Sequence, residues 1–178
     1  MKIVDAGFGG VQLVQLDPRQ DDRGSFTRSF CRKTFVKAGL NTDWPQINIS
    51  RTCQRGSVRG LHFQKSPEEE IKLVTCVTGV VFDVVVDVRP RSTTFGQWRS
   101  YTLSELNSIS LYIPAGFAHG FQCLTDECRM SYLMSCDFDP TLATGVRHND
   151  PSLAISWPLP VTCISPKDAV LPFIESTK

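Results

Sequence analysis

Hydrophobic and polar residues alternate in many short runs along this chain, a pattern typical of β-strands. The clearest run is Val80–Val88, in which every second residue is Val or Phe, so that one face of the predicted strand is wholly apolar. Shorter runs predict further strands over residues 1–16 (a strand after a turn), 25–30, 46–51, 57–64, 72–77, 98–103, 110–113, 117–124 and 130–135. Turn signals separate these runs at fairly even spacing, which indicates an all-β sandwich, jelly roll or barrel.

Helical signals are few. Residues 32–38 are the best candidate, since the segment ends at Gly39 and glycine commonly terminates helices. A short C-terminal helix is expected from Ser165, and residues 17–24 read as a polar loop. We see no internal repeat, low-complexity tract or linker, so a single domain over residues 1–178 is expected.

Composition excludes several classes of protein. The formal net charge is only +1 and no basic block occurs, which argues against nucleic-acid binding. No apolar run approaches the roughly 18 residues of a membrane span, and the first residues lack the apolar segment of a secretory signal, so a cytoplasmic protein is expected. The seven cysteines are scattered without a C-x-x-C pair, which favours reduced thiols that mostly fill the core.

The segment Ser57–Gln64 concentrates the candidate chemistry in one predicted strand. Strict alternation would place Arg59 on one face and His62 and Gln64 on the other. Gly60 would stand beside His62, where a side chain would crowd an approaching ligand. A strand that carries these side chains suits a polar, anionic ligand. A half-buried strand with one hydrogen-bonded histidine explains the segment equally well.

The histidines limit the possible chemistry, because the chain has only His62, His119 and His148. No H-x-H or H-x-x-x-H pair occurs, so no metal is expected, and no G-x-S-x-G elbow marks a serine nucleophile. Acid–base chemistry remains, in which a histidine paired with a carboxylate abstracts a proton, a lysine stabilises an enolate oxygen and a tyrosine returns a proton. Spacing alone does not assemble these groups.

A set of longer motifs sharpens this interpretation. They run in order along the chain: Asp22–Phe26, Gln46–Asn48, Val58–Gln64, Lys72–Val74, Phe82–Arg89, Thr94–Trp98, Ile113–Phe121, Asn149–Pro151 and Trp157–Pro158. With this ordered set, the chain resembles the dTDP-4-dehydrorhamnose 3,5-epimerase family. The resemblance implies a cupin-like jelly roll (double-stranded β-helix) with a few short helices, usually a homodimer, that needs no metal or organic cofactor.

The resemblance also implies a reaction and the residues that perform it. It implies an epimerase of a nucleotide-linked 4-keto-6-deoxyhexose, acting at C3, C5 or both in deoxysugar biosynthesis. In this interpretation His62 with Asp168 is the base, Tyr132 is the acid and Lys72 lies near the keto oxygen. Further residues are matched to substrate binding: Arg23, Phe26, Arg28, Gln46, Asn48, Arg59, His119 and Phe138.

The chain departs from the family pattern at several positions outside this proton-transfer set. Arg28 replaces a common Glu, Leu133 a Lys, Phe138 a Tyr, Ala143 a Glu and His148 a Trp. The change at position 28 reverses a charge and exchanges an acceptor for donors, which leaves the nucleotide base open. The alternatives are an epimerase of a CDP-linked or other nucleotide-linked keto sugar, a 3,4-ketoisomerase, and a non-catalytic cupin that binds sugar nucleotides.

Overall fold

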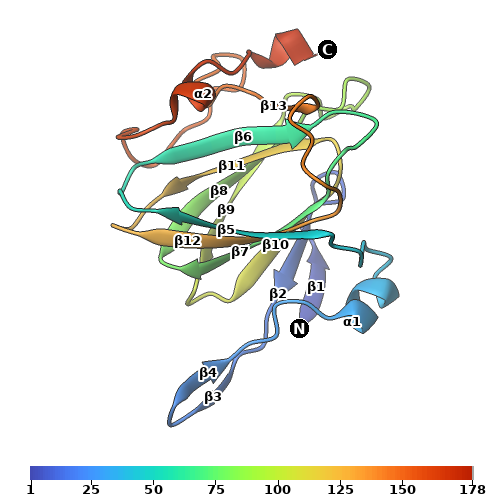
Figure 1. Cartoon of the computed structure of the whole chain (residues 1–178), viewed down its shortest axis with the longest axis vertical. Helices are drawn as coiled ribbons and strands as arrows, with labels where there is room; N and C mark the ends of the chain where they lie inside the picture. The colour runs from blue at the N-terminus through green and yellow to red at the C-terminus, as the bar shows by residue number, and fades with distance from the viewer. Residues whose placement is uncertain (178) are drawn as a thin grey trace.

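Two antiparallel sheets that face each other dominate the computed structural model, which describes residues 1–177 (Figure 1). The six-stranded sheet has the order β1 (Lys2–Asp5), β2 (Gln12–Gln15), β10 (Ile109–Ile113), β7 (Lys72–Thr78), β12 (Cys128–Met134) and β5 (Gln46–Thr52). The five-stranded sheet has the order β13 (Ala143–Gly145), β6 (Val58–Gln64), β11 (Phe117–Cys123), β8 (Val80–Asp87) and β9 (Trp98–Ser104). The all-β prediction is confirmed, and the two sheets form the predicted cupin-like jelly roll.

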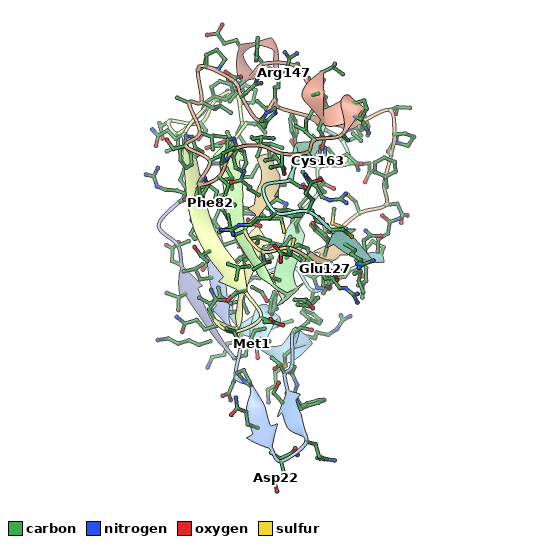
Figure 2. The ribbon with its side chains drawn as sticks, turned by 90° about the vertical axis from the view of Figure 1, so that its left-hand side faces the viewer. Met1, Asp22, Phe82, Glu127, Arg147 and Cys163 are labelled. Atoms are coloured by element: carbon green, nitrogen blue, oxygen red, sulfur yellow. The ribbon has the colours of Figure 1, made fainter. Side chains whose placement is uncertain are left out.

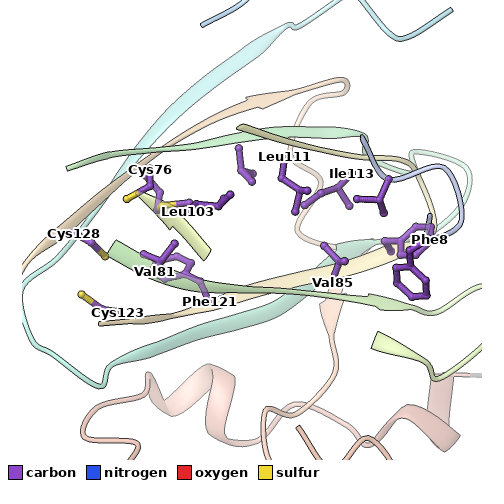
Figure 3. Packing of buried hydrophobic residues seen from close by; sticks show 14 residues of the cluster. Phe8, Cys76, Val81, Val85, Leu103, Leu111, Ile113, Phe121, Cys123 and Cys128 are labelled. Atoms are coloured by element: carbon purple, nitrogen blue, oxygen red, sulfur yellow. The ribbon is translucent and has the colours of Figure 1, made fainter. Parts of the chain in front are cut away.

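The inward faces of the two sheets share one hydrophobic core. Val81 and Val85 of β8 and Phe121 of β11 meet Leu111 of β10 and Met130 of β12 across the gap between the sheets (Figure 3). All five side chains are almost completely buried. Burying each such side chain contributes about 1.5–3 kcal/mol, so this cluster holds the two sheets together.

Strand β8 is buried on its second face as well. The apolar face predicted from the sequence, with Val84 and Val86, packs under Leu153 and Ile174 from the C-terminal part of the chain. That part, coloured red in Figure 1, runs over the outside of the five-stranded sheet. Coverage on both faces explains why β8 has the longest valine-rich run in the sequence.

The N-terminal region differs from the prediction in two places. Residues 1–16 form a hairpin of β1 and β2 rather than one strand. The expected polar loop and the strand after it form a second hairpin, β3 (Arg19–Asp21) and β4 (Gly24–Phe26). This hairpin, here called the arm, projects away from the barrel with Asp22 at its tip (Figures 1 and 2). All residues of its two strands are exposed, so burial produces no alternation that the sequence could reveal.

Both predicted helices are confirmed in shortened form. Helix α1 (Arg32–Lys37) packs Phe35 against the outside of the six-stranded sheet, and α2 (Pro166–Ala169) follows its N-cap Ser165. A 3-10 helix, η1 (Ile174–Thr177), ends the described chain. None of the described helices has the length and the apolar character that a bilayer span requires.

The cysteines are unpaired, as expected, but they are not mostly core residues. Cys76, Cys123 and Cys128 are buried, whereas Cys53 and Cys163 are exposed. The two exposed thiols line the cavity described next rather than the core.

Candidate active site

A cavity of about 730 Å³ is lined by strands of both sheets and by the segment that contains α2. Most of the predicted site residues line it: Asn48, Arg59, His62, Lys72, His119, Tyr132, Phe138 and Asp168. These residues come from seven different elements or loops spread over most of the chain. Folding therefore concentrates the candidate chemistry in one place.

A β-bulge decides which side chains of β6 face this cavity. His62 pairs with His119 of β11, and Arg59 pairs with Phe121 of the same strand. Between these two pairs β6 advances by three residues while β11 advances by two. The extra residue reverses the alternation. Arg59 and His62 therefore line the same cavity, and their predicted placement on opposite faces is wrong.

Gly60 lies within this irregularity, and its role differs from the predicted one. A Cβ atom at Gly60 would lie 2.6 Å from the Cα atom of Gly120 and 2.6 Å from the carbonyl oxygen of His119. Its φ of +107° also lies where side chains are disfavoured. The missing side chain therefore makes room for the neighbouring strand rather than for a ligand.

The first acid–base pair joins His62 to Asp168, far apart in the chain. Nε2 of His62 lies 2.8 Å from Oδ1 of Asp168, and the Gly60 N–H donates to Oδ2 at 3.1 Å. The Ser165 hydroxyl accepts from the Asp168 N–H and caps the short helix that carries the carboxylate. Burial alone would raise the pKa of Asp168, but these hydrogen bonds and the attraction of His62 hold it below its usual range. Asp168 is therefore an ionised partner for the histidine.

A second pair lies deeper. Nε2 of His119 is 2.8 Å from Oδ2 of Asp83, and both side chains are nearly inaccessible. Burial raises the pKa of the Asp83 carboxyl against the opposing attraction of His119 and Lys72. Oδ1 of Asp83 has no hydrogen-bond partner among the described residues. Asp83 is not among the predicted site residues, although a carboxylate in the middle of the most apolar strand is a signal in the sequence.

Lys72 has an acidic neighbour, Glu70, that is also not among the predicted site residues. Its Nζ donates to the carbonyl oxygen of His62 at 2.8 Å and lies 2.5 Å from Oε1 of Glu70. Both side chains are largely buried, and both line the cavity. Glu70 is the last of three consecutive glutamates, a run that reads as a solvated loop, so nothing in the sequence marked it.

Tyr132 presents a protonated hydroxyl to the cavity. Its ring lies edge-on to His119, with 6.2 Å between the centroids, and its hydroxyl is 3.2 Å from the Ser50 hydroxyl. Burial raises the pKa of Tyr132 above its usual range. The hydroxyl therefore keeps its proton at neutral pH and can donate it.

Two glutamines hold the loop at the mouth of the cavity. Oε1 of Gln46 accepts from the N–H of Phe138, and Oε1 of Gln64 accepts from the N–H of Asp139. Nε2 of Gln64 donates to the carbonyl oxygen of Asp137. Gln46 does not line the cavity, and it contacts the site only by holding the backbone of Phe138, which does line it.

The arm does not reach the cavity of its own chain. Arg23 forms an ion pair with Asp21 at the tip, and Phe26 is 72% exposed. Arg28 follows β4 and is also exposed. None of Arg23, Phe26 and Arg28 is among the residues that line the cavity.

The other departures from the family pattern are divided between the site and the core. Ala143 lines the cavity beside Gln64. Leu133 is buried under α1, and His148 lies outside the cavity, where its carbonyl oxygen accepts from the Trp157 indole. Within the described residues, no cluster of three or more His, Cys, Asp or Glu side chains could hold a metal ion.

Comparison with known proteins identifies the family. A sequence model described as dTDP-4-dehydrorhamnose 3,5-epimerase matches residues 6–176. The chain belongs to the dTDP-4-dehydrorhamnose 3,5-epimerase family. It is an isomerase of the epimerase type.

Members of this epimerase family from several bacteria resemble the chain over most of its length. A dTDP-4-dehydrorhamnose 3,5-epimerase of Sinorhizobium fredii is 40% identical over 91% of this chain and 84% of its own. A dTDP-4-dehydrorhamnose 3-epimerase of Streptomyces niveus is 39% identical over 94% of this chain and 81% of its own. The crystal structure of a 4-keto-6-deoxy sugar epimerase from the novobiocin biosynthetic gene cluster of Streptomyces spheroides superimposes with a TM-score of 0.94 at 37% identity, covering 99% of this chain and 88% of that one.

Proposed function

We propose that this protein epimerises a dTDP-linked 4-keto-6-deoxyhexose at C3, C5 or both, in deoxysugar biosynthesis. The observation that carries the proposal is the His62–Asp168 pair, which faces the same cavity as Lys72 and Tyr132. The C4 ketone makes the hydrogens on C3 and C5 acidic, so these groups suffice for the reaction without a cofactor. The dTDP portion of the substrate is proposed from the names of the relatives.

In the proposed mechanism, His62 removes the proton. Asp168 occupies Nε2, so the Nδ1 lone pair is left to accept a proton from C3 or C5. The carboxylate fixes this tautomer and stabilises the imidazolium that forms. The electron pair of the broken C–H bond forms a double bond between that carbon and C4. The C4 carbonyl oxygen thereby becomes an enolate oxygen.

Lys72 and Tyr132 complete the cycle. The ammonium of Lys72 stabilises the negative charge on the enolate oxygen. The Tyr132 hydroxyl then delivers a proton to the opposite face of the same carbon, which inverts the centre and restores the ketone. The imidazolium then releases its proton to solvent and the tyrosinate takes one from solvent, so the enzyme ends in its starting state.

Substrate binding is proposed for residues around these groups. The Arg59 guanidinium, fixed by hydrogen bonds to the Thr52 hydroxyl and the Arg51 carbonyl oxygen, would hold the diphosphate, with His119 and Asn48 near the sugar. The exposed ring of Phe138 at the mouth would stack on the base.

The arm supports the predicted homodimer. Arg23 and Phe26 of the arm, and Arg28 just after it, lie outside the cavity of their own chain, so they could bind substrate only in the cavity of another copy. The edge strand β5 offers the exposed side chains of Ile47 and Ile49 as a surface for such a copy. We therefore propose a homodimer that exchanges arms, which sedimentation of the full chain and of a variant lacking residues 19–26 would test.

The decisive experiment follows deuterium. Incubation with dTDP-4-keto-6-deoxyglucose in deuterium oxide, read by proton NMR, is expected to show deuterium entering C3, C5 or both. The CDP-linked sugar, run in parallel, ranks the nucleotides and tests whether the Arg28 departure changes the preferred base. Absence of exchange with both sugars would refute the proposal.

A second experiment separates the enzyme from a binding module. His62→Ala should abolish exchange while the affinity for dTDP, measured by calorimetry, stays close to that of the wild type. An unchanged exchange rate in this variant would contradict the assignment of His62 as the base.

A further inference from the structure

The carboxylate of Glu70 lies in the cavity, yet no step of the proposed reaction uses it. Its side chain is only 12% exposed, whereas the preceding Glu68 and Glu69 are exposed. A largely buried carboxylate is stable in a protein only when it is paired. Its partner is Lys72, the lysine proposed to stabilise the enolate.

The ion pair fixes the ammonium of Lys72 at two points. An ammonium group has three N–H donors. One donates to the His62 carbonyl oxygen at 2.8 Å, and Oε1 of Glu70 forms an ion pair with the same nitrogen at 2.5 Å. Lys72 belongs to β7 of one sheet and His62 to β6 of the other, so the side chain spans the two walls of the cavity. Among the described residues, the third N–H has no acceptor.

We propose that Glu70 is a positioning residue for Lys72. Its carboxylate and the His62 carbonyl together prevent the ammonium from rotating, so that the third N–H is held toward the substrate's ketone oxygen. A lysine stem has four rotatable carbons, and a single anchor would leave the ammonium free to swing. Donors that are oriented before the reaction stabilise the enolate without reorganisation at the moment it forms. This inference rests on the proposed function.

Two variants separate the acceptor oxygen from the shape of the side chain. Glu70→Gln keeps a neutral oxygen acceptor at the same length, whereas Glu70→Met keeps the length and removes the acceptor. We expect kcat for deuterium exchange to fall about 10- to 100-fold in Glu70→Met, with KM nearly unchanged, because a misplaced group costs rate rather than binding. Glu70→Gln should retain most of the wild-type rate. Glu69→Met, the same change at the exposed neighbour, is the matched control and should match the wild type.

A measurement on the resting protein tests the positioning without any substrate. With ¹⁵N-labelled lysine, the Lys72 ammonium should give a sharp NMR signal at neutral pH, since buried, hydrogen-bonded ammonium hydrogens exchange slowly with water. Lys72→Met assigns the signal. The signal should persist in Glu70→Gln and disappear in Glu70→Met.

The outcomes distinguish this inference from the proposed function. If the wild type exchanges no deuterium with either keto sugar, the proposed function fails, while the NMR series still shows whether Glu70 holds Lys72. If Glu70→Met keeps the wild-type exchange rate, or loses it while the Lys72 signal is unchanged, the inference is overturned. If Glu70→Met does not fold, Glu70→Asp replaces it, because its side chain is one methylene shorter and withdraws the acceptor from Lys72. A wild-type exchange rate in Glu70→Asp also overturns the inference.

Discussion

Replacing Asp168 by asparagine should disable the proposed base, His62, through its tautomer rather than its position. Asparagine has one oxygen acceptor and one NH₂ donor, where aspartate has two acceptors. The Gly60 N–H is a fixed donor that reaches Oδ2 at 3.1 Å, so the asparagine oxygen would turn toward it. The NH₂ group would then face Nε2 of His62, which must become the acceptor. The proton moves to Nδ1, and the nitrogen proposed to receive the substrate proton loses its lone pair.

The size of the loss follows from the geometry. Forcing the wrong tautomer in the comparable histidine–aspartate pair of serine proteases costs about 10⁴-fold in kcat. Here the His62 side chain is 45% exposed, so water can reach the ring and part of the function survives. We therefore expect a loss of about 10³-fold, which corresponds to about 4 kcal/mol in activation free energy.

The same substitution should change stability in a pH-dependent way. The pKa of Asp168 is lowered in the folded protein, so its ionised form stabilises the fold above the pKa of the unfolded chain. Asp168→Asn should be less stable than the wild type at pH 7. This difference should begin to fade as the pH falls below about 4, where the carboxyl of the unfolded chain becomes protonated, and should be lost below the lowered pKa of the folded protein.

Deuterium exchange by proton NMR and dTDP affinity by calorimetry provide the assay. Asp87→Asn is the matched control, because Asp87 is equally buried but does not line the cavity. The control should keep the wild-type exchange rate. An Asp168→Asn exchange rate within about tenfold of the wild type, or a parallel loss of dTDP affinity, would refute the tautomer argument.

Three further results are expected. Tyr132→Phe should reduce formation of the inverted product, followed by NMR, more than it reduces deuterium exchange, and equal losses would contradict its role as the acid. Burial opposes ionisation of Asp87, but hydrogen bonds from Arg89 and two hydroxyl groups lower its pKa to about 2. In denaturant titrations, Asp87→Asn should therefore lose about 2 kcal/mol at pH 7, and a loss that persisted at pH 2 would contradict this reasoning. Gly60→Ala should lose about 3 kcal/mol or more in the same titrations, since its Cβ would lie 2.6 Å from the Cα atom of Gly120, and a wild-type midpoint would contradict that contact.

Local pattern predicted the barrel strands well because those strands are buried on at least one face. Strand β8 was predicted over 80–88 and is found over Val80–Asp87, and α1 was predicted over 32–38 and is found over Arg32–Lys37. The arm was missed because both of its strands are exposed, so burial leaves no period in the sequence.

The residues of the candidate site were likewise predicted only in part. The family resemblance named His62, Lys72, Tyr132 and Asp168, and all four line one cavity. No local signal named Glu70, because an acidic run has the same appearance whether its last residue faces water or a lysine.

By itself, the sequence determined the all-β class and most barrel strands, since each leaves a pattern within a few neighbouring residues, and its resemblance to the family named the candidate acid–base groups. Only the tertiary structure decided how those groups meet. The bulge in β6 turned Arg59 toward the cavity, and α2 brought Asp168 to within 2.8 Å of His62 across the fold. Such contacts depend on strand register and on hydrogen bonds between segments about a hundred residues apart, and no local pattern records them.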